Sequence, residues 1–309
     1  KIQYEKYKKI MNTLKLIEKL RDKPAGAPVV PVYSFDTLYQ YFDVLKKTNI
    51  PCGLQFSLDS VNKYDELVQM LRLAAELRAK YETYTFFVYD AGNDIDSAMD
   101  MTAEEVEIIR YDGTHEEDFE YINTATQLSE KVHKDGDRQL LEIELGKWLD
   151  ADLDSPFHDI FAITEAIEKI QPDILGFQFV NVYKDFEFRG TKQLDKELIK
   201  DLYSKVSLPI SFRGIEILPS EFVKQAQHLD LYLEYGVGIK TEALRNTLET
   251  GGALIYLGRD SELAARLAKR KFTLDPDAIQ VQHLLDKTGE EIEILLTKAG
   301  EILKVQHLE

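Results

Sequence analysis

The hydrophobic pattern alternates along the chain between short apolar runs and longer stretches with apolar residues at helical spacing. The short runs, such as residues 85–88, are apolar on both faces, which is typical of strands buried in a parallel sheet. The longer stretches repeat apolar residues three and four positions apart, which predicts amphipathic helices. We expect eight strands, at residues 28–35, 51–57, 83–90, 106–113, 139–146, 173–181, 209–214 and 229–236.

A helical stretch follows each expected strand, and this strict alternation predicts an α/β fold, a (β/α)8 TIM barrel. We expect a single domain over residues 1–309, with the barrel at about 27–250. A helix at 2–21 precedes the barrel and a helical extension at about 252–306 follows it. A doubly wound open sheet is the alternative fold, but no glycine-rich first turn supports it.

Composition narrows the class of partner. The formal net charge of −17 argues against nucleic acid and anionic membranes, since both require a basic face. It leaves room for an anionic small molecule held by a few local cations. No apolar run approaches the length of a membrane span and no signal peptide is recognisable. The single cysteine, Cys52, excludes an internal disulfide and fits a reducing cytoplasm, where we expect the protein to reside.

The stretch Leu140–Glu144, with the leucine and glycine that follow it, carries the clearest chemical signal. Read as a strand, it places Glu142 and Glu144 on one face and apolar residues on the other. Two carboxylates on a buried face need a cation, buried donors or an open sheet edge. We expect Glu144 to face a site and Glu142 to be a deeper, hydrogen-bonded residue. The alternative is that water solvates both carboxylates at an edge strand.

Functional groups of a barrel lie at the C-terminal ends of its strands. Polar side chains at the expected ends are Asp90, Asp112, Glu144, Asn181, Tyr183, Lys184, Arg213 and Glu234. The three carboxylates of Asp90, Asp112 and Glu144 should converge on one arc, where they need a hard cation, a shared proton or a neighbouring Arg or Lys. Arg213, Lys184 and Arg189 lie on the opposite arc and could supply that charge.

Histidines are scarce at the strand ends. Only His115 closely follows one, and a structural role at the start of the next helix is the simpler interpretation. A multi-histidine zinc site cannot be assembled from the expected strand ends. The sequence therefore predicts no zinc site and no resident cofactor, with Mg²⁺ or Mn²⁺ as the alternative.

Four segments carry a family resemblance: Leu141-Glu142-Ile143-Glu144-Leu145-Gly146, Tyr111-Asp112-Gly113-Thr114-His115, Pro172-Asp173-Ile174-Leu175 and Phe179-Val180-Asn181-Val182-Tyr183. In order and spacing they resemble the class II, zinc-dependent fructose-bisphosphate and tagatose-bisphosphate aldolases. The resemblance implies a TIM barrel, a homodimer and reversible aldol cleavage of a ketose bisphosphate, with zinc polarising the carbonyl. It also implies an acid/base role for Asp90 and a peripheral metal position at Asp112 and Glu144.

The departures from that family concern its metal and phosphate ligands. Its three zinc histidines fall, by this resemblance, at Ala91, Tyr183 and Arg213, and none of these side chains binds zinc well. Its glycine loop for phosphate becomes Ile215-Glu216, and its substrate-binding Asn segment aligns with Leu233-Glu234-Tyr235-Gly236. We therefore expect a divergent member that lacks the three zinc histidines.

Three functions remain open from the sequence. The first is a pseudoenzyme, a barrel kept as a binding or regulatory protein. The second is an altered carbon–carbon lyase of the aldolase type, with Asp90 as acid/base and Arg213 replacing zinc as a fixed cation. Its substrate, a small anionic carbonyl or sugar phosphate, would contact Asn181, Tyr183, Lys184 and Glu234, and Asp112 with Glu144 would hold Mg²⁺ or Mn²⁺. The third is a standard zinc aldolase.

Simpler interpretations accompany two of these expectations. Arg213 could merely neutralise Asp90, Glu216 or Glu234 by a salt bridge. The terminal helix offers an apolar stripe for a homodimer, but the same stripe could pack on its own barrel. The residues of this stripe are Ile292, Leu295, Leu296 and Leu303.

Overall fold

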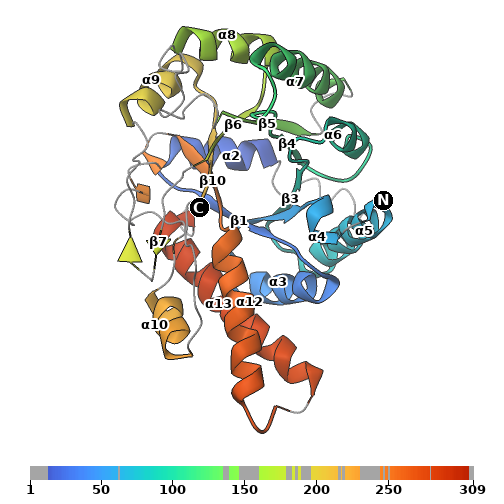
Figure 1. Ribbon diagram of the computed structural model, residues 1–309, viewed down its shortest axis with the longest axis vertical. Coiled ribbons are helices and arrows are strands. Elements are labelled where there is room, and N and C mark those ends of the chain that lie inside the picture. The colour runs from blue at the N-terminus through green and yellow to red at the C-terminus, as the bar shows by residue number, and fades with distance from the viewer. Residues whose placement is uncertain are drawn as a thin grey trace.

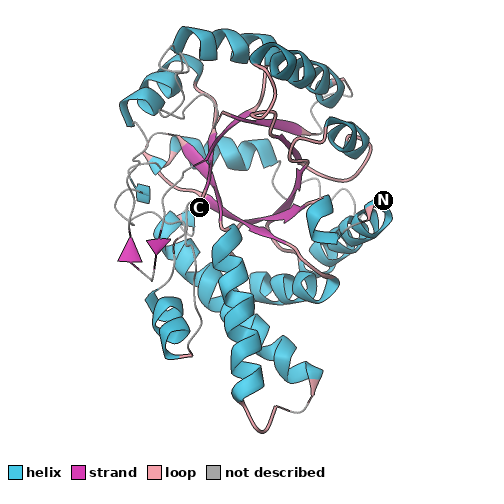
Figure 2. Ribbon diagram, in the orientation of Figure 1, coloured by secondary structure: helices cyan, strands magenta, loops and turns pink. Residues whose placement is uncertain are grey.

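Eight parallel strands close into a barrel in the computed structural model of the chain (Figures 1 and 2). Their order around the barrel is β1-β10-β9-β6-β5-β4-β3-β2. The strands are β1 (Ala27–Pro31), β2 (Cys52–Phe56), β3 (Thr85–Asp90), β4 (Ile108–Tyr111), β5 (Leu140–Glu144), β6 (Ile174–Gln178), β9 (Ile210–Arg213) and β10 (Gly252–Tyr256). The structure describes residues 13–61, 63–134, 139–145, 160–178, 183–184, 187–188, 196–214, 217, 220–229, 244–245, 248–249, 251–278 and 280–305.

Helices surround this ring of strands, as Figure 2 shows, except that α2 (Thr13–Asp22) crosses the ring in this view. They are α2, α3 (Phe35–Thr48), α4 (Leu58–Val61), α5 (Tyr64–Tyr81), α6 (Ile95–Met101), α7 (Asp118–His133), α8 (Ile160–Ile170), α9 (Lys196–Val206), α10 (Ser220–His228), α12 (Gly258–Leu274) and α13 (Val281–Leu303). A small antiparallel pair, β7 (Tyr183–Lys184) and β8 (Glu187–Phe188), lies outside the barrel sheet. The predicted (β/α)8 barrel is confirmed. None of the described helices combines the length and apolarity needed to cross a lipid bilayer.

The eighth strand differs from the expectation. Strand β10, at Gly252–Tyr256, pairs with β1 and β9 and closes the barrel. The prediction of an eighth strand at 229–236 and of a barrel end near 250 is therefore wrong, although most of 229–236 lies outside the described residues. The run at 229–236 places Asp230 and Glu234 between apolar residues, a pattern of half-exposed strands, whereas all of β10 is buried. Strands of a parallel barrel are typically apolar on both faces over most of their length.

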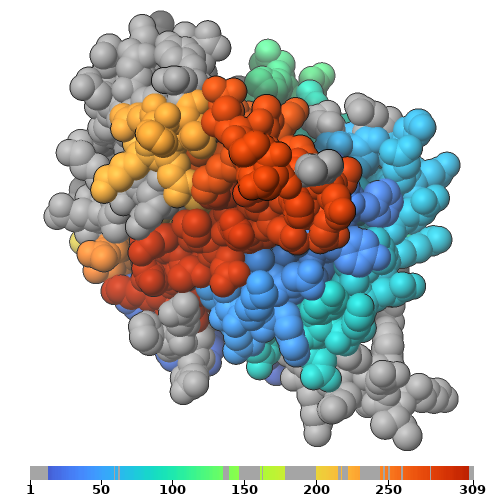
Figure 3. All heavy atoms as spheres, turned by 90° about the horizontal axis from the view of Figure 1, so that it is seen from below, coloured from blue at the N-terminus to red at the C-terminus, as the bar shows by residue number. Residues whose placement is uncertain are grey.

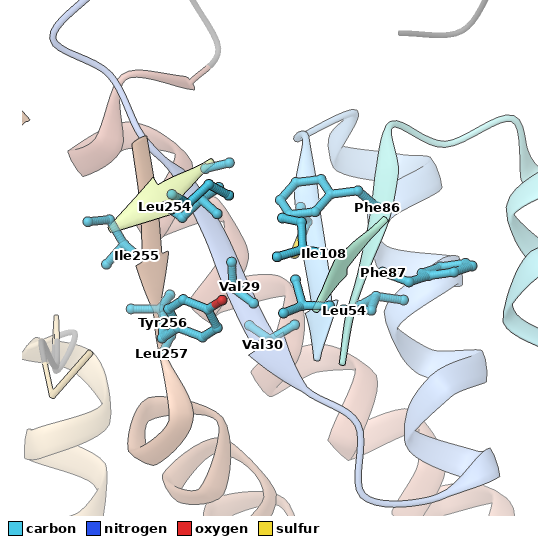
Figure 4. Packing of buried hydrophobic residues seen from close by; sticks show 14 of the residues in the cluster. Val29, Val30, Leu54, Phe86, Phe87, Ile108, Leu254, Ile255, Tyr256 and Leu257 are labelled. Carbon is cyan, nitrogen blue, oxygen red and sulfur yellow. The ribbon is translucent and has the colours of Figure 1, made fainter. Parts of the chain in front are cut away.

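The barrel interior is apolar toward the N-terminal ends of the strands. Phe86 fills the space that Gly53 leaves, because an added Cβ at Gly53 would lie 2.6 Å from the Phe86 ring and 2.9 Å from Val29. Figure 4 shows Phe86 and Val29 on the inner side and Phe87 pointing away from them. Phe87 instead packs under the guanidinium of Arg78 on α5, 4.2 Å from the ring centroid. Alternation along the strands thus separates the interior from the helix layer.

The C-terminal helix packs on its own barrel. Helix α13 lies against α12 and α3, as the space-filling view in Figure 3 also shows. All four residues of its expected dimer stripe are buried in this packing. The simpler interpretation, in which the stripe packs on its own barrel, is therefore confirmed. A homodimer stays a prediction, and this stripe cannot form its interface.

Among the described residues, five that are not glycine adopt the left-handed conformation, each directly after a helix: Asn49, Glu82, Gln171, Ser207 and Lys304. Glu82 ends α5 with φ 54°, and its N–H donates to the carbonyl oxygen of Arg78. Its side chain is exposed. A side chain in this conformation is strained, whereas glycine adopts it freely.

Replacing Glu82 with glycine is expected to raise the free energy of unfolding by about 0.5–1 kcal/mol, because it removes this strain. Chemical denaturation measures the change. Glu76, exposed in the middle of α5, provides the control. Glu76→Gly should lower stability by about 1 kcal/mol, as glycine does inside a helix. A loss of stability in both variants would contradict the strain at Glu82.

Candidate functional site

Polar side chains fill the barrel interior toward the C-terminal ends of the strands. They come from six strands: Gln55, Asp90, Arg110, Glu142, Glu144, Ser211, Arg213 and Tyr256. Parallel register places Arg110 of β4 beside Asp90 of β3 on one side and Glu142 of β5 on the other. The site therefore combines residues that lie far apart in the sequence.

Arg110 is the centre of the site, and its side chain is only 1% exposed. Its Nη1 lies 2.7 Å from Oδ1 of Asp90, and its Nη2 lies 2.7 Å from Oε2 of Glu144. The same Nη2 is 3.5 Å from Oδ2 of Asp112, and Nε is 3.5 Å from Oε1 of Glu142. Burial alone would lower the pKa of Arg110, but the surrounding carboxylates raise it well above its ordinary value. One guanidinium thus faces four carboxylates.

Sequence reasoning missed Arg110. Its signal was available, because a single arginine interrupts the apolar run Ile108–Tyr111 and shares the face of Asp112 in strand alternation. A charge at such a position must find a partner inside the barrel. Three converging carboxylates were expected to need a cation, a proton or a basic residue. The structure shows a basic residue, Arg110, and it comes from the same arc of the barrel as the three carboxylates.

Asp90 is held by donors on both oxygens. Its Oδ1 accepts from Arg110 and, at 3.2 Å, from the N–H of Gly92. Its Oδ2 accepts from Nε2 of Gln55 at 2.7 Å and from Nη2 of Arg213. Burial alone would raise the pKa of Asp90, but the charges of Arg110 and Arg213 outweigh it and hold the pKa well below its ordinary value. Asp90 is therefore a stable anion and a weak base.

Arg213 lies at the outer side of this cluster. Its side chain is 22% exposed, and its guanidinium carbon lies 4.9 Å from the centre of the Tyr256 ring. The ion pair with Asp90 confirms the simpler interpretation, in which Arg213 neutralises a neighbouring acid. Of the other two acids considered for that role, Glu216 and Glu234 both lie outside the described residues.

Glu142 is the deeper carboxylate, as expected. Its Oε1 accepts from the Ser211 hydroxyl at 2.7 Å and its Oε2 from the Tyr256 hydroxyl at 2.6 Å. Burial raises the pKa of Glu142. Arg110 and these two hydroxyls lower it by less, so the pKa lies above its ordinary value. Strand β5 lies between β4 and β6, and both glutamates are fully buried, so the edge-strand alternative is wrong.

A glycine on the neighbouring strand makes room for the two glutamates. Gly176 of β6 pairs in register with Glu144 of β5. An added Cβ there would lie 3.3 Å from Oε1 of Glu142 and 3.3 Å from Oε2 of Glu144. Any larger residue at this position would press on both carboxylates.

The expected hard-metal pair is engaged with protein donors. Oδ1 of Asp112 accepts from the Thr114 hydroxyl at 2.5 Å and from the Thr114 N–H at 3.2 Å. Its other oxygen and Glu144 both face Arg110. Among the described residues, no three His, Cys, Asp or Glu side chains are placed to hold one metal ion. Zinc prefers the nitrogen of histidine and the sulfur of cysteine. This site instead holds carboxylates and two guanidiniums, which are cations without a free acceptor and do not bind zinc.

Several expected site residues are not placed with this cluster. Asn181, Arg189 and Glu234 lie outside the described residues. Of Tyr183 and Lys184 the structure describes only the backbone, which forms β7. His115 is exposed in the turn that follows β4.

A closed parallel barrel with charged residues at the C-terminal ends of its strands defines a TIM barrel with a candidate site at its mouth. The chain belongs to the class II fructose-bisphosphate aldolase family, because the sequence model described as "Fructose-bisphosphate aldolase class-II" matches residues 11–302. A search of curated proteins gave no match.

Solved structures agree on the fold. The chain is similar to the YdjI aldolase of Escherichia coli K12, with a TM-score of 0.72 and 16% identity over 95% of this chain and 96% of that one. It is also similar to the fructose-bisphosphate aldolase of Campylobacter jejuni, with a TM-score of 0.70 and 18% identity over 94% of this chain and 93% of that one. At these identities the likeness shows the fold alone.

Proposed function

We propose that this class II aldolase-like barrel functions without zinc aldolase chemistry, as a binding or regulatory protein for a small molecule at the barrel mouth. The observation that carries the proposal is the state of Asp90, the acid/base position by resemblance. Its two oxygens accept four hydrogen bonds, two of them from guanidiniums. A general base works best with a pKa near the working pH. Asp90 is far from that condition.

The residues at the family's metal positions support the same proposal. By resemblance, the zinc histidines correspond to Ala91, Tyr183 and Arg213. Arg213 is a permanent cation already paired with Asp90, so it repels a metal ion rather than binding it. The net charge of −17 favours a small molecule over nucleic acid or an anionic membrane as the partner, within a cytoplasmic setting.

A second candidate is an altered enzyme of the carbon–carbon lyase type. It is favoured by Arg213, which is partly exposed and held against the Tyr256 ring. A guanidinium in a fixed plane can donate two hydrogen bonds to an enediolate or a carboxylate. Catalysis would require a ligand to displace Arg213 from Asp90, since the carboxylate is otherwise occupied. An Asp112–Glu144 metal pair would likewise have to compete with Arg110.

Metal analysis and an aldolase assay test the proposal. We expect purified protein to contain zinc far below one ion per chain. With added zinc, cleavage of fructose bisphosphate or tagatose bisphosphate should not exceed a metal-free blank, because no three His, Cys, Asp or Glu side chains among the described residues are placed to hold one metal ion and Asp90 is paired with two guanidiniums. Stoichiometric zinc with turnover would overturn the proposal.

A variant at Arg213 separates the two candidates. If a screened ligand raises the melting temperature of the wild type and not of Arg213→Lys, the mouth is its binding site. Lysine keeps the charge but loses the planar pair of donors. Turnover of that ligand by the wild type, abolished in Asp90→Ala, would favour the altered enzyme.

A further inference from the structure

The acidic groups at the mouth exceed the basic ones that contact them. Four carboxylates, on Asp90, Asp112, Glu142 and Glu144, face the single guanidinium of Arg110 within 3.5 Å. Of the four, Glu142 and Glu144 are completely buried. Like charges this close exclude one another unless a cation lies between them. We name these four carboxylates the carboxylate cage.

Arg110 fits this cage by charge more than by hydrogen-bond geometry. Its Nε is buried and has no hydrogen-bond partner, since the Glu142 oxygen lies 3.5 Å away. A site shaped for a guanidinium would satisfy this donor, because an orphaned buried N–H destabilises the fold. The cage therefore meets a general requirement for positive charge, which an ion could also meet.

We infer that the Arg110 guanidinium takes the place of a divalent cation, and that this one side chain keeps hard metal ions out of the carboxylate cage. Hard cations such as Mn²⁺ bind carboxylate oxygens. Asp90 lies on β3, Glu142 and Glu144 lie on β5, and Asp112 directly follows β4, so neighbouring strands bring the four acids around one space. Gly176 lets both glutamates lie close to β6, since an added Cβ there would lie 3.3 Å from an oxygen of each.

The inference does not rest on the proposed function. It concerns the charge inside the barrel, while the proposed function concerns zinc and turnover. A wild-type protein with zinc aldolase activity would overturn the proposed function and leave the cage unaffected. Conversely, a cage that fails to bind a metal leaves the proposed function intact.

The experiment compares Mn²⁺ binding by the wild type and by Arg110→Met, followed by electron paramagnetic resonance and calorimetry. We expect no saturable binding by the wild type. The variant should bind one Mn²⁺ per chain, and its melting temperature should rise with Mn²⁺ concentration. Adding Glu144→Gln to the variant should weaken binding at least about tenfold, since it removes a ligand. Arg78→Met is the matched control, because the carboxylate that Arg78 pairs with, among the described residues, is that of Glu107 alone, and it should not bind Mn²⁺.

A second variant guards against a folding failure. Arg110→Met with Glu142→Gln carries one buried negative charge fewer and keeps three cage carboxylates. It should fold more readily and still bind Mn²⁺. Folded variants that do not bind Mn²⁺ would overturn the inference, as would variants that fail to fold even in its presence. Saturable binding by the wild type that Glu144→Gln abolishes would also overturn it.

Discussion

Replacing Arg110 with methionine in the absence of metal is expected to lower the free energy of unfolding by about 3–5 kcal/mol. Methionine retains much of the side-chain length, so the loss reports charge rather than volume. The substitution leaves Asp90, Glu142 and Glu144 without the cation that they share. Removing one partner of a buried ion pair costs more than the pair contributes, because it leaves the remaining charge unbalanced. Urea unfolding at neutral pH measures the change.

An exposed ion pair provides the control for that prediction. Lys47 of α3 lies 3.4 Å from Glu293 of α13, and both side chains are largely exposed. Lys47→Met also removes one positive charge but should change stability by less than about 1 kcal/mol. Equal losses in the two variants would mean that net charge, rather than the buried cluster, sets the effect of Arg110.

The alternation of apolar runs and amphipathic stretches was sufficient to predict the barrel. It also placed Glu142 and Glu144 inside, because strand alternation is a local property of the sequence. The error in the eighth strand came from accepting an alternating run at 229–236. The continuous apolar run at Gly252–Tyr256 is what a strand buried on both faces requires.

The partners of each charge could not be predicted in the same way. Asp90, Arg110 and Glu142 meet because three parallel strands align in one register, and barrel closure sets that register. No single strand contains this information. The convergence of Asp90, Asp112 and Glu144 was expected, and an arginine within a buried strand could have been flagged as a residue that needs a partner, but that this arginine lies between those acids could not have been read from one strand. From the strand ends alone, Arg213 was the arginine expected to neutralise the converging carboxylates, whereas Arg110 contacts most of them.

Replacing Asp90 with asparagine is expected to lower the free energy of unfolding by about 3 kcal/mol at pH 7, because Arg110 and Arg213 both lose their shared anion. The loss should depend on pH. The folded state lowers the pKa of Asp90, so the carboxylate stabilises the fold fully above its unfolded pKa of about 4. This stabilisation disappears as pH falls through the folded pKa.

The difference in stability between wild type and Asp90→Asn should therefore shrink as pH falls from about 5 toward 2. Glu142 has the opposite dependence, because its raised pKa favours the fold at low pH, but it is present in both proteins and largely cancels. Asp96→Asn, in the exposed first turn of α6, should change stability by less than about 0.5 kcal/mol throughout. Urea unfolding at a series of pH values measures all three proteins. A difference that stayed constant down to pH 2 would mean that Asp90 contributes through packing and neutral hydrogen bonds. The two guanidiniums would then not be the reason that this acid is buried at the mouth.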